Sequence, residues 1–450
     1  MTEPRRLYLP LISLAGVLLM PLMSVPIMPS DYRPVGALLL FIPAMLYMID
    51  YMAGHHVRKD ELLLLLFMLV STLQAAVMTG MDGLGWGAVA RGLLPLLLGI
   101  ACYLAMRRLL ERELMRTVAA LTTSMQVICI LGLVELFAMA GVLPGAIKTV
   151  IGTVFSGIVN TRLQLTTQEA SWAVRLLVFA VPLFVYAYRQ TRRKKYLLLS
   201  TAASGMFLFA FSLDGIFILL IAALLYFLLS KPIRPAQVLR MVGYVGGAVG
   251  VIALVFYVLL TFQGDSYYIG RLAGVADHLE LDPELVAVFD GSTFIRAFYP
   301  IIALRTFLDH PFGVGPGNFP YFFNYYIEHD YRFALTLVPE VAANFNEMTG
   351  SPKSLYTRLL AEHGLISGWF FVAFLWWHVR RVVALCRKGL TPLAVLNAQL
   401  FVVALASVIQ FASFAYMFMW FSLALNAALA QKLGVPAALE GQAAAAPDFS

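Results

Sequence analysis

The chain has 450 residues, of which 61% are hydrophobic and only 13% are charged. Soluble domains carry roughly 25% charged residues, so this composition excludes an ordinary soluble enzyme. The formal net charge is +7, but the basic residues cluster in short connections between apolar stretches, which argues against a nucleic-acid partner. The three cysteines, Cys102, Cys129 and Cys386, lie in or beside those stretches. The sequence therefore predicts neither a disulfide framework nor a cysteine-based metal site.

Apolar stretches of about 20 residues recur along the chain, and each is long enough to cross a bilayer as a helix. We therefore predict an all-α polytopic membrane protein with about twelve transmembrane helices. The predicted spans are 7–28, 35–53, 61–80, 86–106, 117–140, 171–188, 196–212, 214–230, 240–262, 362–379, 391–411 and 413–431.

Basic residues decide the predicted orientation, because cytoplasmic connections carry an excess of Lys and Arg. They occupy every second connection, whereas the short alternate connections contain few charges. The basic connections hold Arg58 and Lys59; Arg107, Arg108, Arg112 and Arg116; Arg189, Arg192, Arg193, Lys194 and Lys195; Lys231, Arg234 and Arg240; and Arg380, Arg381, Arg387 and Lys388. This pattern predicts that both termini are cytoplasmic and that the first apolar stretch is an uncleaved span.

Two longer segments fall on the outer side of this arrangement. The first contains an apolar stretch, Ile147–Ile158, which we expect to lie flat at the membrane interface. In the second, Phe294–Leu308 predicts a helix, and the Gly and Pro residues of His310–Asn318 then interrupt regular structure. The predicted regions are spans one to nine in 1–262, a large outer loop in 263–361, spans ten to twelve in 362–433, and a disordered tail in 434–450.

Charges inside a membrane are costly and usually face a cavity. Five of them map to the outer half of the predicted spans: Arg91, Glu135, Glu169, Arg175 and Asp214. One interpretation is an outward-facing polar cavity that accepts an anionic head group. The alternatives are structural ion pairs between helices and, for Asp214, a helix cap.

The outer loop adds further cations that suit phosphate, because a guanidinium group binds it in a bidentate way. These residues are Arg271, Arg296, Arg305, Arg332, Lys353 and Arg358. Arg296 and Arg305 are nine positions apart, so a helix would place them on opposite faces, where they would not share one ligand. The aromatics of Phe319–Phe333, including Tyr325 and Tyr326, suit either sugar stacking or a membrane-interface belt. For the Arg and Lys residues of this loop, the alternative role is to anchor the loop at the membrane interface.

Several kinds of chemistry have no visible site in the sequence. There is no Walker loop, no Asp-x-Asp motif of nucleotide-sugar enzymes, no nucleophile elbow and no metal-ligand spacing. We therefore expect neither a metal nor a cofactor. His310 stands beside Pro311, where a structural role in a turn competes with a substrate contact.

Five segments, in this order, are similar to the bacterial O-antigen ligase and O-antigen polymerase superfamily. They are Thr166–Ser171, Ser292–Arg296, His310–Phe319, Ser354–Tyr356 and Leu360–Gly368. The resemblance extends over about 155–425 and includes the twelve-span arrangement and the large late outer loop.

The resemblance implies a membrane glycosyltransferase with a GT-C-like fold in the bacterial inner membrane, with its active site facing the periplasm. Such enzymes transfer a glycan from an undecaprenyl-pyrophosphate carrier with inversion, without nucleotide sugar, metal or other cofactor. The implied partners are the lipid-linked donor and acceptor, membrane lipids, and proteins of the chain-length-regulator and flippase kinds, with no nucleic acid.

The resemblance also suggests residue roles. Arg296 matches the family's loop arginine and is expected to stabilise the charge that develops on the pyrophosphate leaving group. Glu169 is expected to orient or deprotonate the acceptor hydroxyl. Substrate contacts are expected from Arg91, Arg175, Arg271, Arg305, His310, Tyr325, Arg332 and Lys353.

Three functions remain open at this point. Ligases typically carry a His where this chain has Lys353, which favours a polymerase over a ligase that transfers glycan to lipid A–core. The rival from another class is a lipid-linked oligosaccharide flippase or other secondary transporter. A transporter would have little use for an outer loop of roughly 100 residues and would be expected to show internal repeats.

Overall fold

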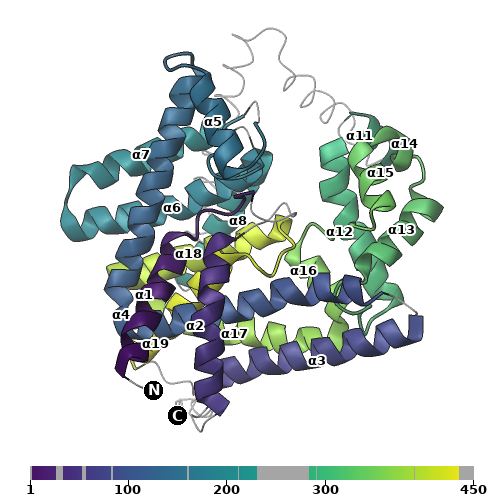
Figure 1. Cartoon of the computed structure of the whole chain (residues 1–450), viewed down its shortest axis with the longest axis horizontal. Coiled ribbons are helices and arrows are strands. Elements are labelled where there is room, and N and C mark those ends of the chain that lie inside the picture. The colour runs from purple at the N-terminus through teal and green to yellow at the C-terminus, as the bar shows by residue number, and fades with distance from the viewer. Residues whose placement is uncertain are drawn as a thin grey trace, which may run out of the picture.

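The computed structural model describes residues 3–26, 34–52, 57–82, 85–159, 162–210, 212–230, 283–289, 291–389 and 391–434. All regular elements in these ranges are helices, which confirms the predicted all-α class (Figure 1). The elements are α1 (Glu3–Leu18), α2 (Val35–Met52), α3 (Lys59–Asp82), α4 (Trp86–Met139), α5 (Ala146–Phe155), α6 (Ala170–Thr191), α7 (Lys194–Phe209), α8 (Leu213–Ser230), α11 (Pro283–Phe289), α12 (Gly291–Asp309), α13 (Phe319–Asp330), α14 (Ala334–Leu337), α15 (Pro339–Asn346), α16 (Leu355–Arg358), the π-helix η1 (Leu359–His363), α17 (Gly364–Lys388), α18 (Pro392–Ser407), the 3₁₀ turn η2 (Val408–Gln410) and α19 (Met417–Lys432).

Five helical stretches of the described ranges are long and apolar enough to cross a membrane, which indicates a membrane protein. They are Lys59–Gly80, Trp86–Met139, Ala170–Thr191, Leu355–Lys388 and Pro392–Gln410. In the remaining predicted spans, the structure describes helices that are shorter or less apolar. The predicted span 7–28 is helical only as far as Leu18, where α1 ends, and the described residues 19–26 are not helical. The predicted span 240–262 lies outside the described residues. The count of twelve spans therefore stays a prediction.

Helix α4 differs from the predicted pair of spans with a loop between them. It continues through the charged stretch 107–116, and only Glu113 departs from helical angles, with φ −129° and ψ 51°. The two halves of α4 run in different directions on either side of this kink (Figure 1). The prediction of a loop was wrong because the stretch contains only Arg, Leu, Glu and Met, which are all strong helix formers.

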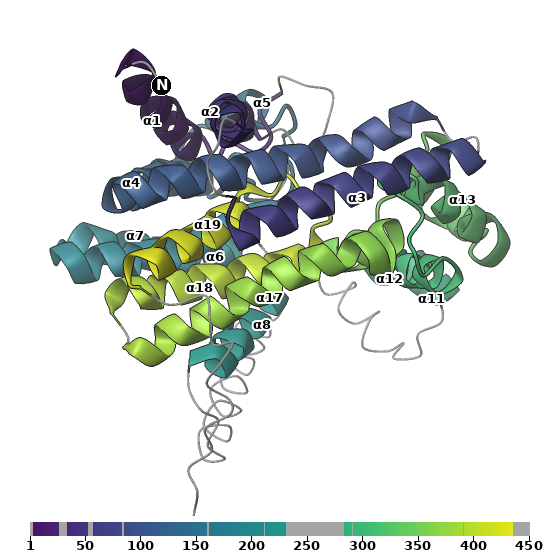
Figure 2. The same cartoon turned by 90° about the horizontal axis from the view of Figure 1, so that it is seen from below.

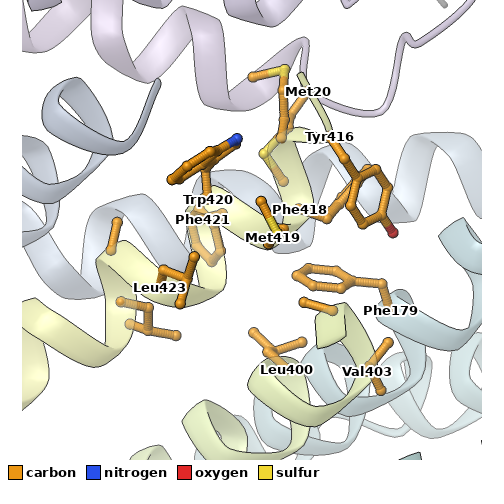
Figure 3. Packing of buried hydrophobic residues seen from close by; sticks show 14 of the residues in the cluster. Met20, Phe179, Leu400, Val403, Tyr416, Phe418, Met419, Trp420, Phe421 and Leu423 are labelled. Atoms are coloured by element: carbon orange, nitrogen blue, oxygen red, sulfur yellow. The ribbon is translucent and has the colours of Figure 1, made fainter. Parts of the chain in front are cut away.

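The main core surrounds α19, the last helix. Every residue from Met417 to Ala430 is buried, as expected for a helix that is apolar on all sides. Trp420 and Phe421 point to one side of α19, and Phe418 packs against Phe179 of α6 with ring centroids 4.6 Å apart (Figure 3). The α19 helix therefore links α4, α6, α17 and α18 into one body.

Within the described part of the predicted outer loop, helices α11 to α15 form a small helical body of their own. Its core is separate from that of the long helices and contains Phe294, Tyr299, Phe319, Phe323 and Val341. The predicted helix Phe294–Leu308 is confirmed as part of α12. This body lies at one end of α3, α17 and the first half of α4, which run side by side (Figures 1 and 2).

Candidate functional site

A polar pocket lies where this small body meets the ends of the long helices. It has a volume of about 170 Å³ and is formed by the start of α4, the start of α13, the loop 348–352 and the turn from α16 into η1. Three charged side chains line it, Arg91, Arg358 and Glu362. Two guanidinium groups against one carboxylate leave an excess of positive charge, so the pocket suits a compact anionic group.

The Gly-rich loop before α13 shapes this pocket through its backbone. Gly313, Gly315 and Gly317 have φ of 84°, 85° and 83°, which L side chains rarely adopt. The Val314 N–H donates to the carbonyl of Ala361 at 2.9 Å, and the Gly315 N–H donates to that of Glu362 at 2.8 Å. The loop is therefore fixed onto η1, and it orders the backbone of Glu362.

Two glycines bring α4 into direct contact with this loop. A Cβ atom on Gly92 would lie 2.3 Å from the amide nitrogen of Gly317, and one on Gly317 would lie 1.9 Å from the carbonyl oxygen of Ala88. No side chain fits at either position. This close approach places Arg91, the residue before Gly92, in the pocket wall.

Arg358 and Glu362 form an ion pair in the opposite wall. Nε of Arg358 lies 2.8 Å from Oε2 of Glu362, and their side chains are only 14% and 3% exposed. Nη1 of Arg358 also donates to the carbonyl of Ala412 at 3.0 Å. Glu362 belongs to the π-helical turn η1, a local structure that is frequent at functional sites. The guanidinium group is thus held in one orientation beside the pocket.

Behind the pocket, α3 supports the loop and η1. The Gln74 amide donates to the carbonyl of Gly313 at 3.1 Å and accepts from the hydroxyl of Ser367 at 2.8 Å. His363 is buried, and its Nδ1 lies 2.9 Å from Oγ of Ser71. Nδ1 of His363 therefore has a hydrogen-bond partner inside the protein, and the residue has a structural role.

The pocket brings together residues for which the sequence had predicted different roles. Arg91 was expected at a substrate site, and the structure places it there. Arg358 was only one of several loop cations, and Glu362 was part of a motif without an assigned role. The available signal was an Arg and a Glu four positions apart at the start of an apolar span, where buried charges need a reason.

Arg175 approaches the same region from α6. Its side chain is buried, and Nη2 donates to the carbonyl of Gln410 at 2.9 Å. Its Cζ lies 5.4 Å from the ring centroid of Phe411. Because Arg358 binds the carbonyl of Ala412, the short segment 410–412 is held by both arginines.

Glu169 and Glu135 have different environments. Glu169 is exposed at the start of α6 and accepts from the hydroxyl of Ser171 at 2.8 Å. Glu135 is fully buried and accepts from the backbone N–H groups of Gln164 and Leu165 at 3.0 and 2.8 Å. Glu135 thus anchors the segment that leads to Glu169, which is a structural role, but through backbone N–H groups and not through the ion pair between helices that was the stated alternative.

The structure separates Arg296 from Arg305 as helix geometry predicts. Arg296 is half-buried on α12, three positions before Tyr299, and α12 packs against η1. Arg305 instead pairs with Asp330, with Nη1 and Oδ2 2.7 Å apart. Arg305 is therefore engaged outside the pocket.

The remaining expected substrate residues lie outside the pocket lining as well. Lys353 donates to Glu340 at 3.0 Å. The His310 ring packs on Phe322, with centroids 4.7 Å apart. Tyr325 and Arg332 are exposed on the small helical body, and Arg271 lies outside the described residues. Asp214 lies in α8.

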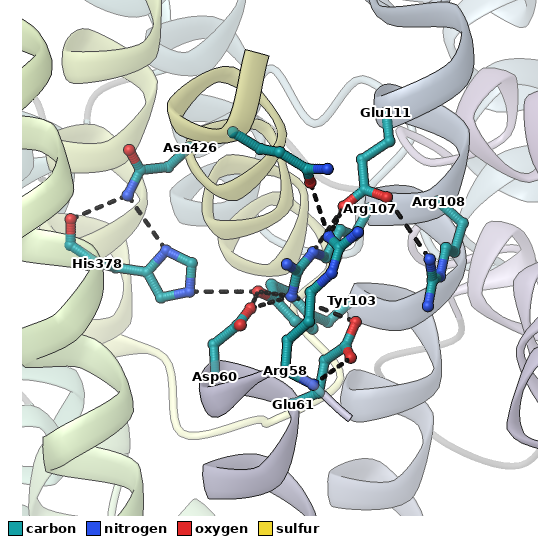
Figure 4. Close-up of polar contacts among 10 residues, drawn as sticks. Arg58, Asp60, Glu61, Tyr103, Arg107, Arg108, Glu111, His378 and Asn426 are labelled. Carbon is teal, nitrogen blue, oxygen red and sulfur yellow. Dashed lines mark hydrogen bonds and ion pairs between the residues drawn. The ribbon is translucent and has the colours of Figure 1, made fainter. Parts of the chain in front are cut away.

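A second polar cluster, which the sequence did not predict, is buried between α3, α4 and α17 (Figure 4). Arg107 of α4 is 2% exposed and pairs with Asp60 and, at 3.0 Å from its Nε, with Glu111. The Tyr103 hydroxyl also donates to Asp60 and lies 3.5 Å from Nε2 of His378. We call these five side chains the buried charge cluster.

The buried charge cluster continues to the surface and deeper into the core. Arg58 pairs with Glu111 and donates to Gln431 at 2.7 Å. On the other side, the Asn426 amide lies 3.1 Å from Nδ1 of His378. Arg107 follows Arg91 by sixteen residues, about 24 Å along a helix, so this cluster is separate from the pocket.

No group of three or more His, Cys, Asp and Glu side chains within the described ranges could hold a metal ion. No family model matches the chain, and no curated protein matches it.

Proposed function

We propose that the chain is a bacterial inner-membrane glycosyltransferase with about twelve spans and a GT-C-like arrangement, and that it polymerises O-antigen or exopolysaccharide repeat units. The donor is an undecaprenyl-pyrophosphate-linked glycan and the acceptor is a lipid-linked sugar at the periplasmic face. The pocket lined by Arg91, Arg358 and Glu362 supports this proposal most strongly. It offers two guanidinium groups, of which Arg358 is held by Glu362, at the junction between apolar helices and the small helical body.

The reaction fits the charges of the pocket. The acceptor hydroxyl oxygen bonds to C1 of the donor sugar, the bond from C1 to the pyrophosphate oxygen breaks, and the hydroxyl proton is released. Negative charge grows on the leaving pyrophosphate. Hydrogen-bond donors that are already in place therefore stabilise the transition state more than the ground state. Arg91 and Arg358 are the proposed donors, and Glu362 orients Arg358.

Three residues from the sequence prediction keep proposed roles in this reaction. Arg296 is proposed as a further contact to the pyrophosphate, supported by the packing of α12 against η1. Glu169 is proposed to orient or deprotonate the acceptor hydroxyl, because its carboxylate is exposed at the start of α6. Arg175 is proposed to hold the segment 410–412 that carries a contact of Arg358.

Two observations bear on the alternative functions. Lys353, where ligases typically carry a His, is paired with Glu340 and is not part of the pocket lining. This supports a polymerase over an O-antigen ligase. The outer loop has an apolar core of its own, which supports an enzyme over a flippase or transporter, because a transporter would not need such a body.

Alanine variants of the arginines test the proposal. With purified protein and lipid-linked repeat units, Arg91→Ala, Arg358→Ala and Arg296→Ala should each lower the rate of polymer formation. One lost charge-assisted contact of about 3–4 kcal/mol in the transition state corresponds to roughly 10²–10³-fold. Arg116→Ala, at an exposed position on α4, is the control and should keep the parent rate. Equal rates for all four variants would refute this site.

A further inference from the structure

The outer face of α12 and α13 carries a cluster of exposed aromatic and ionic side chains that the proposed reaction does not use. Pro320 of α13 lines the pocket. Tyr325 follows it by five residues, which rotates its side chain by about 140° around the helix axis. A single helix therefore contributes to the pocket on one flank and presents Tyr325 on another.

Aromatic rings form the centre of this cluster. Tyr325 is 56% exposed, and its ring lies 4.3 Å from that of His329, with the two planes tilted by 30°. The ring of Tyr326 lies 5.3 Å from Tyr325, nearly perpendicular to it. Nδ1 of His329 is 2.7 Å from the carbonyl oxygen of Tyr325, which holds the histidine ring against the tyrosine. The arrangement is a fixed aromatic platform.

Fixed hydrogen-bonding groups border the platform. Nη1 of Arg305 lies 2.7 Å from Oδ2 of Asp330, and this ion pair is half-exposed. Cζ of Arg305 lies 5.0 Å from the ring centroid of Tyr326, whose hydroxyl donates to Asp309. Burial and the Asp309 carboxylate raise the pKa of Tyr326, so its phenol stays protonated and keeps donating. Donors and acceptors are thus already oriented beside the platform.

We propose that this platform, made by Tyr325 and His329 and bordered by Arg305 and Asp330, binds sugar rings of a glycan chain beyond the unit that reacts in the pocket. A sugar ring has an apolar C–H face, which suits an aromatic ring, and hydroxyl groups that need both donors and acceptors at its edge. Tyrosine provides this contact area with little loss of side-chain entropy. The inference rests on the proposed function, because the pocket must deliver a growing glycan.

A membrane-interface belt is the competing use of exposed tyrosines, and the neighbouring charges argue against it. Interfacial aromatics have apolar surroundings on the side that enters the bilayer. Here Glu328, His329 and Asp330 are consecutive exposed residues on α13, and Arg305 lies beside them. Immersing this face in hydrocarbon would bury several charges, which is costly.

Binding can be measured without turnover. The full chain in nanodiscs is mixed with oligosaccharides of increasing length, released by mild acid from the polysaccharide of the organism that carries this chain. They contain no lipid and no pyrophosphate, so they report the platform alone. Saturation-transfer NMR should show contact with the sugar C–H protons, and the affinity should rise from one repeat unit to several.

Variants separate ring stacking from unspecific apolar contact. Tyr325→Leu keeps an apolar side chain without a ring and should weaken binding by about tenfold, whereas Tyr325→Phe should stay close to the parent. Glu328→Ala, on the same helix, is the matched control and should not change binding. In the polymerisation assay, Tyr325→Leu should raise KM for long acceptors and leave kcat for single-unit acceptors unchanged.

Three results would overturn the inference. One is unchanged oligosaccharide affinity in Tyr325→Leu. Another is parent-like affinity in the empty-nanodisc control, which would assign the contact to lipid. The third is a parent protein that polymerises but binds no oligosaccharide, which would refute this platform alone. Intact binding in a protein that forms no polymer would instead refute the proposed reaction and leave the platform standing.

Discussion

Nε of Arg358 lies 2.8 Å from Oε2 of Glu362, and this pair forms one wall of the pocket at the end of the long helices. The pair spans the transition from α16 into the π-helical turn η1. Because both side chains are nearly buried, the carboxylate determines where the guanidinium group points.

Conservative substitutions of this pair should not be tolerated. Arg358→Lys retains the charge but loses the planar fork that binds Glu362 and the carbonyl of Ala412 together. We expect its kcat to fall by roughly 10²-fold. Glu362→Gln should also lower kcat, because Arg358 would no longer be held. Initial rates on lipid-linked repeat units test both, and a parent-like kcat for Arg358→Lys would show that the guanidinium geometry is not required.

A methyl group at Gly92 should disturb the pocket without touching a charge. Its Cβ would lie 2.3 Å from the amide nitrogen of Gly317, which is backbone and cannot turn away. Gly92→Ala should lower the unfolding free energy by about 1–3 kcal/mol and lower activity as well. Gly87→Ala, five residues earlier on α4, meets nothing within 4 Å and should be neutral or stabilising. Thermal unfolding in detergent compares them, and equal midpoints would contradict the close packing.

The buried charge cluster should be important for stability. Arg107→Met leaves Asp60 without its cation in a buried site, which should lower the unfolding free energy by about 3–5 kcal/mol. Arg116→Met removes a pair with Glu113 whose arginine side chain is 60% exposed, and it should cost less than about 1 kcal/mol. Denaturant unfolding of the two variants tests this, and similar losses would mean that the Arg107 pair is not buried in solution.

The side of the membrane on which the pocket opens can be tested at Ser351, a pocket-lining residue. The native cysteines, Cys102, Cys129 and Cys386, are buried. A Ser351→Cys variant should react with an impermeant thiol reagent in intact spheroplasts, and lipid-linked donor should slow that reaction. Labelling only after lysis would reverse the predicted orientation. Labelling that donor does not affect would separate the donor site from this pocket.

Periodicity and composition predicted the helices well, but they predicted few of the contacts between them. Apolar length identified most helices, and Gly and Pro marked the turn before α13. The continuity of α4 was missed because charge and helix propensity disagree in 107–116, and propensity prevailed there. Burial of Arg107 could not be predicted, since its partner Asp60 comes from another helix.

The candidate site was only partly predictable, because the roles of some residues become visible only from their contacts in the folded chain. Arg91 was identified because a charge within an apolar span is unusual. Glu362 was missed because its importance arises from its pairing with Arg358 and from the π-turn, which no residue pattern specifies. Glu135 was grouped with Glu169 among the charges of the predicted spans, and only the folded chain shows that Glu135 binds two backbone N–H groups.

The product of the reaction distinguishes a polymerase from a ligase and from a protein that transfers no glycan. Purified protein is incubated with undecaprenyl-pyrophosphate-linked repeat units, with and without lipid A–core, and the products are separated by size. We expect a ladder of polymers that forms without lipid A–core and is lost in Arg358→Ala. Glycan transferred to lipid A–core without a ladder would identify a ligase, and unchanged repeat units under both conditions would contradict glycosyl transfer altogether.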